Sequence, residues 1–200
     1  MFTGIIEEIG KIVEITNEKE NKCFKIHSKL SSELKIDQSF SHDGVCLTVT
    51  EIDTKNSTYK VTAIQETLNR TNLAKWHVGY EVNLERAMKA DGRFDGHFVQ
   101  GHIDTIGIID EIHEANGSWM IFIQYQEGLG YTVSKGSITV NGVSLTVVDS
   151  FPNAFSVAII PYTWRHTNLS KLEKDSIVNL EFDIFGKYVQ RLQQMEMNRI

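Results

Sequence analysis

One sequence pattern occurs twice along this chain, and the repeat constrains the fold more than any other feature. Residues 39–49 return as 137–147, residues 4–10 as 101–107, residues 67–73 as 163–169, and residues 82–85 as 178–181, in the same order and 96 to 98 residues apart. Solenoid repeats are shorter, at roughly 20 to 50 residues, whereas a unit of about 95 residues has the size of a domain. The chain is therefore expected to form two similar domains that carry two similar sites.

Composition and charge favour a soluble protein that acts on a small molecule. With 41% hydrophobic and 23% charged residues among 200, the chain can bury two modest cores. The net charge of -6 includes no block of like charges, so neither a nucleic acid nor a membrane is an expected partner. No apolar stretch approaches the roughly 18 residues of a membrane-spanning helix, and no cationic region precedes the first apolar residues, which predicts a cytoplasmic protein. Cys23 and Cys46 are too few for a disulfide scaffold and are expected to be free thiols.

Strand signals dominate both halves, so the fold class is expected to be all-β. Runs of β-branched and aromatic residues at 57–64, 119–123 and 155–160 are separated by short polar turns. Asp43-Gly44 and Asn141-Gly142 are hairpin dipeptides, because these residues tolerate the positive φ of a tight turn. About six strands for each repeat suit a small closed barrel, and residues 67–73 and 163–169 are expected to be short helical turns.

The polar, glycine-rich stretch 88–96 is the predicted boundary between the halves. The expected domains are residues 1–97 and 98–184, followed by a C-terminal helix at 185–200. In that helix Phe185, Tyr188, Val189 and Leu192 follow the i, i+3, i+4, i+7 spacing of one apolar face, which Met195 continues. A helix of about 15 residues needs a surface to cover, and the pattern leaves open whether it docks on its own barrel or packs against copies of itself.

Differences between the halves are the best guide to asymmetric chemistry. Four equivalent pairs differ by a polar residue: Thr3 and Gln100, Ile5 and His102, Cys46 and Ser144, and Ala87 and Asp183. A lone cysteine on a strand is more often a small buried hydrophobe than a nucleophile, and Asp183 could equally be a solvated carboxylate at a strand end. His97 and His102 lack the spacing of a helical metal pair, and no zinc, dinucleotide or triphosphate motif is present, so no metal is expected.

Five motifs together give the chain a specific resemblance. They are MFTGII at 1–6, DGVCLTV at 43–49, GHFVQGHID at 96–104, NGVSLTV at 141–147 and FGKYV at 185–189. Along essentially its whole length the chain resembles the riboflavin synthase family. The resemblance implies two tandem six-stranded Greek-key barrels that each bind one lumazine, and a C-terminal helix that assembles a homotrimer.

The family's reaction is a dismutation, the last step of riboflavin biosynthesis. One 6,7-dimethyl-8-ribityllumazine gives a four-carbon unit to another, which yields riboflavin and 5-amino-6-(ribitylamino)uracil. The resemblance implies a transferase that needs neither a redox cofactor nor a metal. It also implies that the reacting pair is held between the N-terminal barrel of one subunit and the C-terminal barrel of its neighbour, so that positioning supplies much of the acceleration.

Carried onto this sequence, the family's motifs predict two pockets and a catalytic set. The N-terminal pocket would use Gly4, Ile5, Ile6, Cys46, Leu47, Thr48, Thr62, Ala63, Ile64, Gln65, Glu66 and Thr67. The C-terminal pocket would use Gly101, His102, Ile103, Ser144, Leu145, Thr146, Ala158, Ile159, Ile160, Pro161, Tyr162 and Thr163, with Lys135 reaching the partner subunit's ligand. The catalytic candidates are Ser39, Cys46, His102, Thr146 and Asp183.

The roles within that set follow from the chemistry. His102 is the candidate base for the acidic C7 methyl of one lumazine, because imidazole takes up protons near neutral pH. Ser39 and Cys46 would deliver or stabilise the nucleophile that adds to the other lumazine, and Thr146 and Asp183 would orient groups or move protons.

Two further expectations come with the resemblance. Lumazine-binding fluorescence proteins share the barrel without turning the chromophore over, so a non-catalytic binder is the alternative function. The resemblance also suggests an association with lumazine synthase, as a shell around the trimer.

Overall fold

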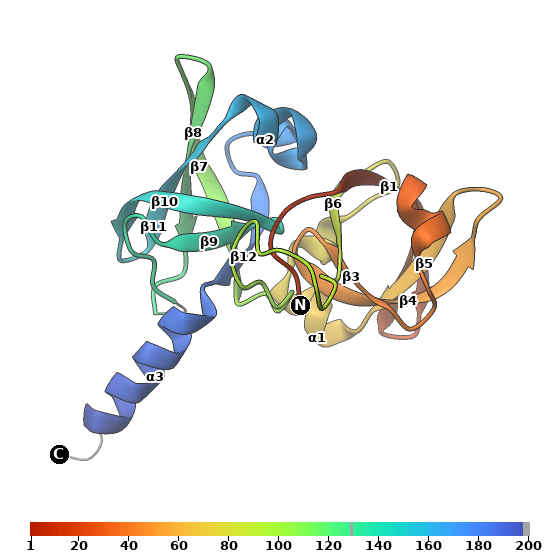
Figure 1. Ribbon diagram of the computed structural model, residues 1–200, viewed down its shortest axis with the longest axis horizontal. Helices are drawn as coiled ribbons and strands as arrows, with labels where there is room; N and C mark the ends of the chain where they lie inside the picture. The colour runs from red at the N-terminus through yellow and green to blue at the C-terminus, as the bar shows by residue number, and fades with distance from the viewer. Residues whose placement is uncertain (129, 198–200) are drawn as a thin grey trace.

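The computed structural model describes residues 1–128 and 130–197, in which two closed antiparallel barrels are followed by one long helix (Figure 1). The first barrel consists of β1 (Glu8–Glu18), β2 (Asn21–His27), β3 (Ser39–His42), β4 (Val45–Asp53), β5 (Thr58–Ala63) and β6 (Glu81–Arg86), in the order β1-β2-β5-β4-β3-β6. The second consists of β7 (Thr105–Ala115), β8 (Ser118–Tyr125), β9 (Ser137–Val140), β10 (Val143–Phe151), β11 (Ala154–Ile159) and β12 (Ile177–Phe182), in the equivalent order. The prediction of two six-stranded barrels is confirmed.

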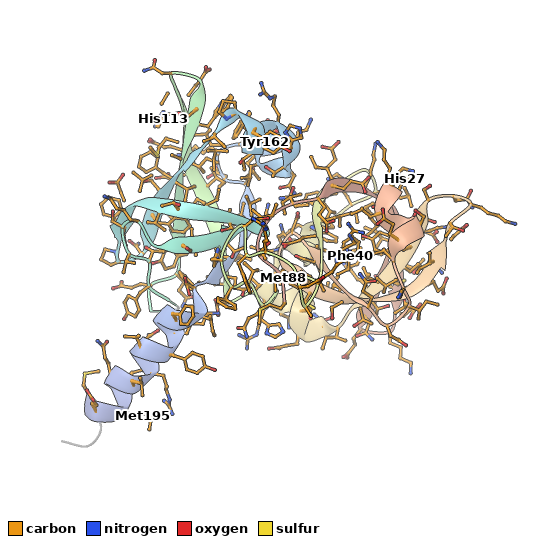
Figure 2. All side chains as sticks on the ribbon, in the orientation of Figure 1. His27, Phe40, Met88, His113, Tyr162 and Met195 are labelled. Atoms are coloured by element: carbon orange, nitrogen blue, oxygen red, sulfur yellow. The ribbon has the colours of Figure 1, made fainter. Side chains whose placement is uncertain are left out.

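Each barrel has a core of its own, built from the alternate residues of its strands that point inward. Phe24, Phe40 and Tyr59 fill the first barrel. Phe155 and Ile121 lie in the core of the second. Figure 2 shows Phe40 inside its barrel, whereas Tyr162 stands on the outer side of a helical turn. Twelve short strands therefore bury two separate clusters.

The two predicted hairpins are present, and their tips meet between the barrels. Asp43 and Gly44 have φ values of 47° and 81°, and Asn141 and Gly142 have 45° and 79°, as a type I′ turn requires. A Cβ on Gly44 would lie 2.8 Å from the backbone nitrogen of Gly142. Both glycines are therefore needed twice, for the turn and for the close approach of the barrels.

The predicted helical turns are also confirmed, each as a helix followed by a 3-10 turn. These are α1 (Gln65–Arg70) with η2 (Asn72–Lys75), and α2 (Pro161–His166) with η3 (Asn168–Lys171); a further turn, η1 (Lys29–Glu33), precedes β3. Thr71 and Thr167 cap η2 and η3, since each side chain accepts a hydrogen bond from the backbone two residues on.

A buried polar network joins the two barrels near the hairpin tips. Nδ2 of Asn83 donates to Oδ1 of Asn168 at 2.8 Å, and Nδ2 of Asn168 donates to Oδ1 of Asp43 at 2.9 Å. The repeat supplies a matching set from the other side, with Asn179 donating to Asn72 at 2.9 Å. Because every member is almost fully buried and hydrogen-bonded, the network fixes one barrel against the other.

The last helix, α3 (Ile184–Met197), leaves the second barrel and extends away from both barrels (Figure 1). Phe185, Tyr188, Val189, Leu192 and Met195 are 43–67% exposed, and none of the described residues of α3 is buried. Docking of the helix on its own barrel, one of the two alternatives, is therefore wrong. Residues 198–200 of the predicted helix lie outside the described residues. In the part of the chain that the structure describes, no helix is long and apolar enough to cross a membrane.

Candidate functional site

Two crossing segments connect the barrels at the candidate site. Phe2 and Val99 form an isolated antiparallel bridge, so the chain runs from it in opposite directions toward Gly4 and toward Gly101. The carbonyl of Gly4 accepts a hydrogen bond from Ser144 N at 2.8 Å, and the carbonyl of Gly101 accepts one from Cys46 N at 2.9 Å. Each segment therefore precedes the first strand of one barrel and lies against a strand of the other.

Both crossing points require glycine. Gly4 and Gly101 each have a φ of +80°, and a Cβ would lie 2.6 Å from the Cβ of Ser144 or of Cys46. Beyond them, Ile6 packs against the core of the second barrel and Ile103 against the core of the first. The side chains of each crossing segment thus also pack on the opposite barrel.

This crossing corrects the grouping of the site residues. The sequence placed residues 4–6 with residues 46–48, and residues 101–103 with residues 144–146, because equivalent segments were assigned to the half that contains them. That pairing is wrong: residues 101–103 lie against residues 46–48, and residues 4–6 lie against residues 144–146. The structure therefore brings the segments that carry Cys46 and His102, expected in separate pockets, together on the first barrel.

The first site lies where β4 and β5 separate. Their pairing begins at Val49 and Val61, and ahead of it the segment 101–103 takes the place of β5 beside residues 46–48. The remaining predicted members, residues 62–67, are the end of β5 and the start of α1. Ser39 pairs with Thr48 at the start of β3, so their side chains share a face. His102 is exposed and Cys46 is half-buried, which leaves both open to a ligand.

The second site repeats this arrangement on the other barrel. Pairing of β10 with β11 begins at Val147 and Val157, ahead of which residues 4–6 lie beside residues 144–146. Residues 158–163 form the end of β11 and the start of α2, where Ile160 and Tyr162 are 60% and 66% exposed. Thr146 pairs with Ser137 as Thr48 pairs with Ser39.

A histidine that the sequence did not assign contacts the second candidate site. Nδ1 of His97 lies 2.7 Å from Oγ of Ser144, and Nε2 lies 3.1 Å from Oγ1 of Thr139. Burial lowers the pKa of His97, while the charge of the Asp183 carboxylate acts in the opposite direction. Asp183 itself accepts a hydrogen bond from Phe185 N at 3.0 Å at the start of α3. The catalytic candidates therefore divide between the sites, with Ser39, Cys46 and His102 at the first, and Thr146 and Asp183 at the second.

Lys135, which the sequence also assigned to the site, lies apart from these contacts. Lys135, in the turn before β9, has an exposed side chain and a φ of 65°, and its backbone nitrogen donates to Val147 O at 2.8 Å. The exposed position leaves its ammonium group accessible to another molecule.

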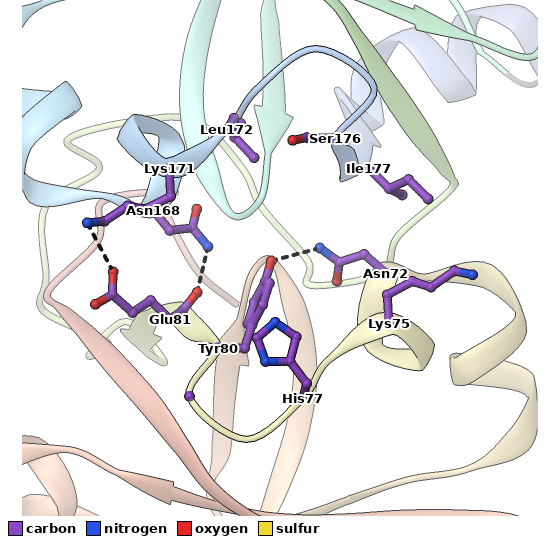
Figure 3. A pocket seen from close by; sticks show the side chains of 11 residues that line it. Asn72, Lys75, His77, Tyr80, Glu81, Asn168, Lys171, Leu172, Ser176 and Ile177 are labelled. Atoms are coloured by element: carbon purple, nitrogen blue, oxygen red, sulfur yellow. Dashed lines mark hydrogen bonds and ion pairs between the residues drawn. The ribbon is translucent and has the colours of Figure 1, made fainter.

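One sizeable cavity does not coincide with either site. It has a volume of about 530 Å³ and lies between the barrels, where Figure 3 shows Tyr80 with its hydroxyl toward Asn72, between Lys75 and Lys171. A second cavity, of about 390 Å³, touches the crossing segment at Thr3 and Ile5. Many of the predicted ligand residues are instead exposed on the surface.

Comparison with known proteins agrees with this geometry. The sequence pattern of the lumazine binding domain family matches residues 3–87 and 100–183. The chain is 46% identical to riboflavin synthase of Actinobacillus pleuropneumoniae and 40% identical to that of Bacillus subtilis, in each case over 96% of this chain and 89% of the relative. The crystal structure of LumP complexed with riboflavin superposes with a TM-score of 0.83 at 25% identity, over 91% of this chain and 99% of that chain. With two lumazine-binding repeats and relatives of this similarity over nearly its full length, the chain belongs to the riboflavin synthase family.

Proposed function

We propose that this protein converts two molecules of 6,7-dimethyl-8-ribityllumazine into riboflavin and 5-amino-6-(ribitylamino)uracil by transfer of a four-carbon unit. The observation that carries the proposal is the pair of equivalent sites with unlike polar groups, a thiol and an imidazole at one and a hydroxyl hydrogen-bonded to His97 at the other. A reaction between two identical molecules needs two like binding sites and different chemistry at each.

Substrate binding would follow the two groups of residues that lie together. Backbone groups at 46–48 and 101–103, and at 144–146 and 4–6, suit the pyrimidinedione edge of a lumazine, which presents alternating donors and acceptors. The segments 62–67 and 158–163 would close each site and offer hydroxyl groups to the ribityl chain.

The chemistry would divide between the sites. At the first, His102 would remove a proton from the C7 methyl of one lumazine, and Cys46 or Ser39 would deliver or stabilise the nucleophile. At the second, Thr146 and Asp183 would orient groups or move protons. No step requires a redox change outside the two lumazines, because one gains the four carbons that the other gives up.

A homotrimer would bring the two kinds of site together. The crossing segments leave the Phe2–Val99 bridge in opposite directions and reach different barrels, so each chain has its two sites on separate barrels. Pairing the first site of one subunit with the second site of its neighbour would unite the catalytic candidates, and Lys135 would reach the partner's ligand. The exposed apolar face of α3 supports assembly through this helix, since burying its five large side chains would add favourable apolar burial. A cytoplasmic location and an association with lumazine synthase complete the proposal.

The test is to incubate the purified protein with 6,7-dimethyl-8-ribityllumazine alone. Riboflavin and the uracil product should form in equal amounts. Tight binding of lumazine without riboflavin would overturn the proposal and favour the fluorescence-protein alternative, in which the same barrels hold the chromophore without turnover.

A further inference from the structure

The repeated motif Val-Asn-Leu-Glu, at residues 82–85 and 178–181, ends in a buried glutamate that the roles above do not use. Along β6 and β12 the valine and leucine point into the two cores, so the asparagine and the glutamate point the other way. The asparagines belong to the network between the barrels. Glu85 and Glu181 are 4% and 2% exposed, and a carboxylate buried to this extent requires partners.

The partners of Glu181 are three consecutive backbone N–H groups. Gln100 N donates to Oε1 at 2.7 Å, Gly101 N donates to Oε2 at 2.9 Å, and His102 N donates to Oε2 at 3.0 Å. Successive N–H groups around a residue in the left-handed conformation form an anion-binding nest, and Gly101 has that conformation. The nest is thus filled by a carboxylate of the chain itself.

Glu85 does the same for the other crossing segment. Its Oε1 accepts from Thr3 N at 2.7 Å and from Oγ1 of Thr3 at 3.0 Å, and its Oε2 accepts from Gly4 N at 3.0 Å. Burial raises the pKa of Glu85, and raises that of Glu181 to about 7, while the backbone donors lower both. Each carboxylate therefore holds its segment at a cost in desolvation, which an apolar residue at that position would not incur.

We propose that Glu85 and Glu181 are positioning residues, each of which fixes one crossing segment and with it one wall of a lumazine site. Glu181 sets the backbone of His102, and Glu85 sets the backbone of Gly4 and of the segment that carries Ile5. His102 is the proposed base, whereas Ile5 at the equivalent position is apolar. Replacing the two glutamates should therefore affect the kinetics differently. The expected kinetic effects rest on the proposed function. The hydrogen bonds of the two glutamates do not depend on it.

Replacement by glutamine tests the proposal, since the amide keeps the size of the side chain but has one acceptor oxygen and presents an NH₂ group to N–H donors. In Glu181→Gln, kcat should fall about 10- to 100-fold, as expected when a catalytic group is displaced by a fraction of an ångström to about 1 Å. The affinity for lumazine should change by less than about five-fold. In Glu85→Gln, the KM for lumazine should rise by a larger factor than kcat falls. Glu18→Gln, which makes the same charge change at an exposed strand end, is the matched control.

Hydrogen exchange of the unmodified protein provides a second measurement that requires no variant to fold. The amides of residues 100–102 should be protected, because Glu181 accepts from all three. Unprotected amides there, or equal effects of the two substitutions on kcat and on KM while the unmodified protein forms riboflavin, would overturn the inference and leave the function intact. If the unmodified protein forms no riboflavin, the function fails, and the exchange result alone decides whether the glutamates hold the segments.

Discussion

Replacing Asp43 by asparagine should stabilise the protein at neutral and alkaline pH. Asp43 is fully buried between the barrels, where it accepts hydrogen bonds from Asn83 N at 2.8 Å, from Nδ2 of Asn168 at 2.9 Å and from the hydroxyl of Tyr80 at 3.2 Å. None of these donors carries a charge. Burial raises the pKa of Asp43 from 3.8 to about 7, although the hydrogen bonds act in the opposite direction.

The expected magnitude follows from this pKa. A carboxyl whose pKa is higher in the folded state keeps a proton that the unfolded chain releases, so the free energy of unfolding falls as the pH rises from about 4 to about 7. The difference corresponds to about 4 kcal/mol. Asparagine cannot ionise, and Asn141 already occupies the equivalent position in the second half, with Asn179 N donating to it at 2.8 Å. The gain from Asp43→Asn should therefore be small below pH 4 and approach about 4 kcal/mol above pH 7.

Urea unfolding at several values of pH between 4 and 9 measures this gain. Tryptophan fluorescence would follow the unfolding, since Trp76 packs on Tyr80 in the first barrel and Trp119 and Trp164 pack against the core of the second. Only the difference between the variant and the unmodified protein is used, so that titration of other carboxyls cancels. Asn141→Asp should show the opposite dependence. A stability difference that does not change with pH, or one that favours aspartate as the pH rises, would refute the reasoning.

Three predictions concern catalysis and assembly. His102→Gln should slow turnover at least ten-fold while lumazine affinity changes much less, and equal losses in steady-state kinetics and equilibrium binding would contradict its role as a base. Leu192→Asp should convert the proposed trimer to monomers in sedimentation velocity and abolish activity, because it places a charge on the apolar face of α3; an active monomer would rule out a shared site. Mixing His102→Gln subunits with Asp183→Asn subunits should restore activity beyond that of either variant alone, since some interfaces would then combine two intact sites; no recovery in a refolded mixture would contradict the pairing of barrels across subunits.

The repeat was sufficient to predict the barrels because strand pairing within each half is local. The signals at Asp43-Gly44 and Asn141-Gly142 fix the hairpins through backbone conformations that few residues adopt. The arrangement of the sites depends instead on where the chain passes between the halves. Nothing in the one-dimensional pattern indicates that Gly101 lies against Cys46 rather than against Ser144, since the two halves have nearly equivalent strands there. Comparing the halves position by position therefore pairs segments that the fold separates.

Two kinds of residue were missed for different reasons. His97 lies just before the second repeat and has no counterpart in the first, because Phe98 is already equivalent to Met1. A search for differences between equivalent positions could not find it. Glu85 and Glu181 occupy equivalent positions in the two halves, so the sequence did contain a signal for them. Glutamate is rarely buried, and one that recurs in the same strand motif of both halves indicates a structural role. Polar residues that are the same in both halves, as well as those that differ, therefore help to locate the candidate site.

The crossing also explains how a duplicated fold supports asymmetric chemistry. Each site takes one wall from either half: the first combines Cys46 with the segment of His102, and the second combines Ser144 with the segment of Ile5. A substitution in one crossing segment therefore changes the site on the opposite barrel and leaves the strand residues of its own barrel untouched. The two sites therefore receive their histidines differently: His102 belongs to the segment that crosses beside Cys46, whereas His97, from outside the repeat, contacts the hydroxyl of Ser144 at 2.7 Å. Two domains with nearly the same backbone can in this way hold the same molecule and treat it differently.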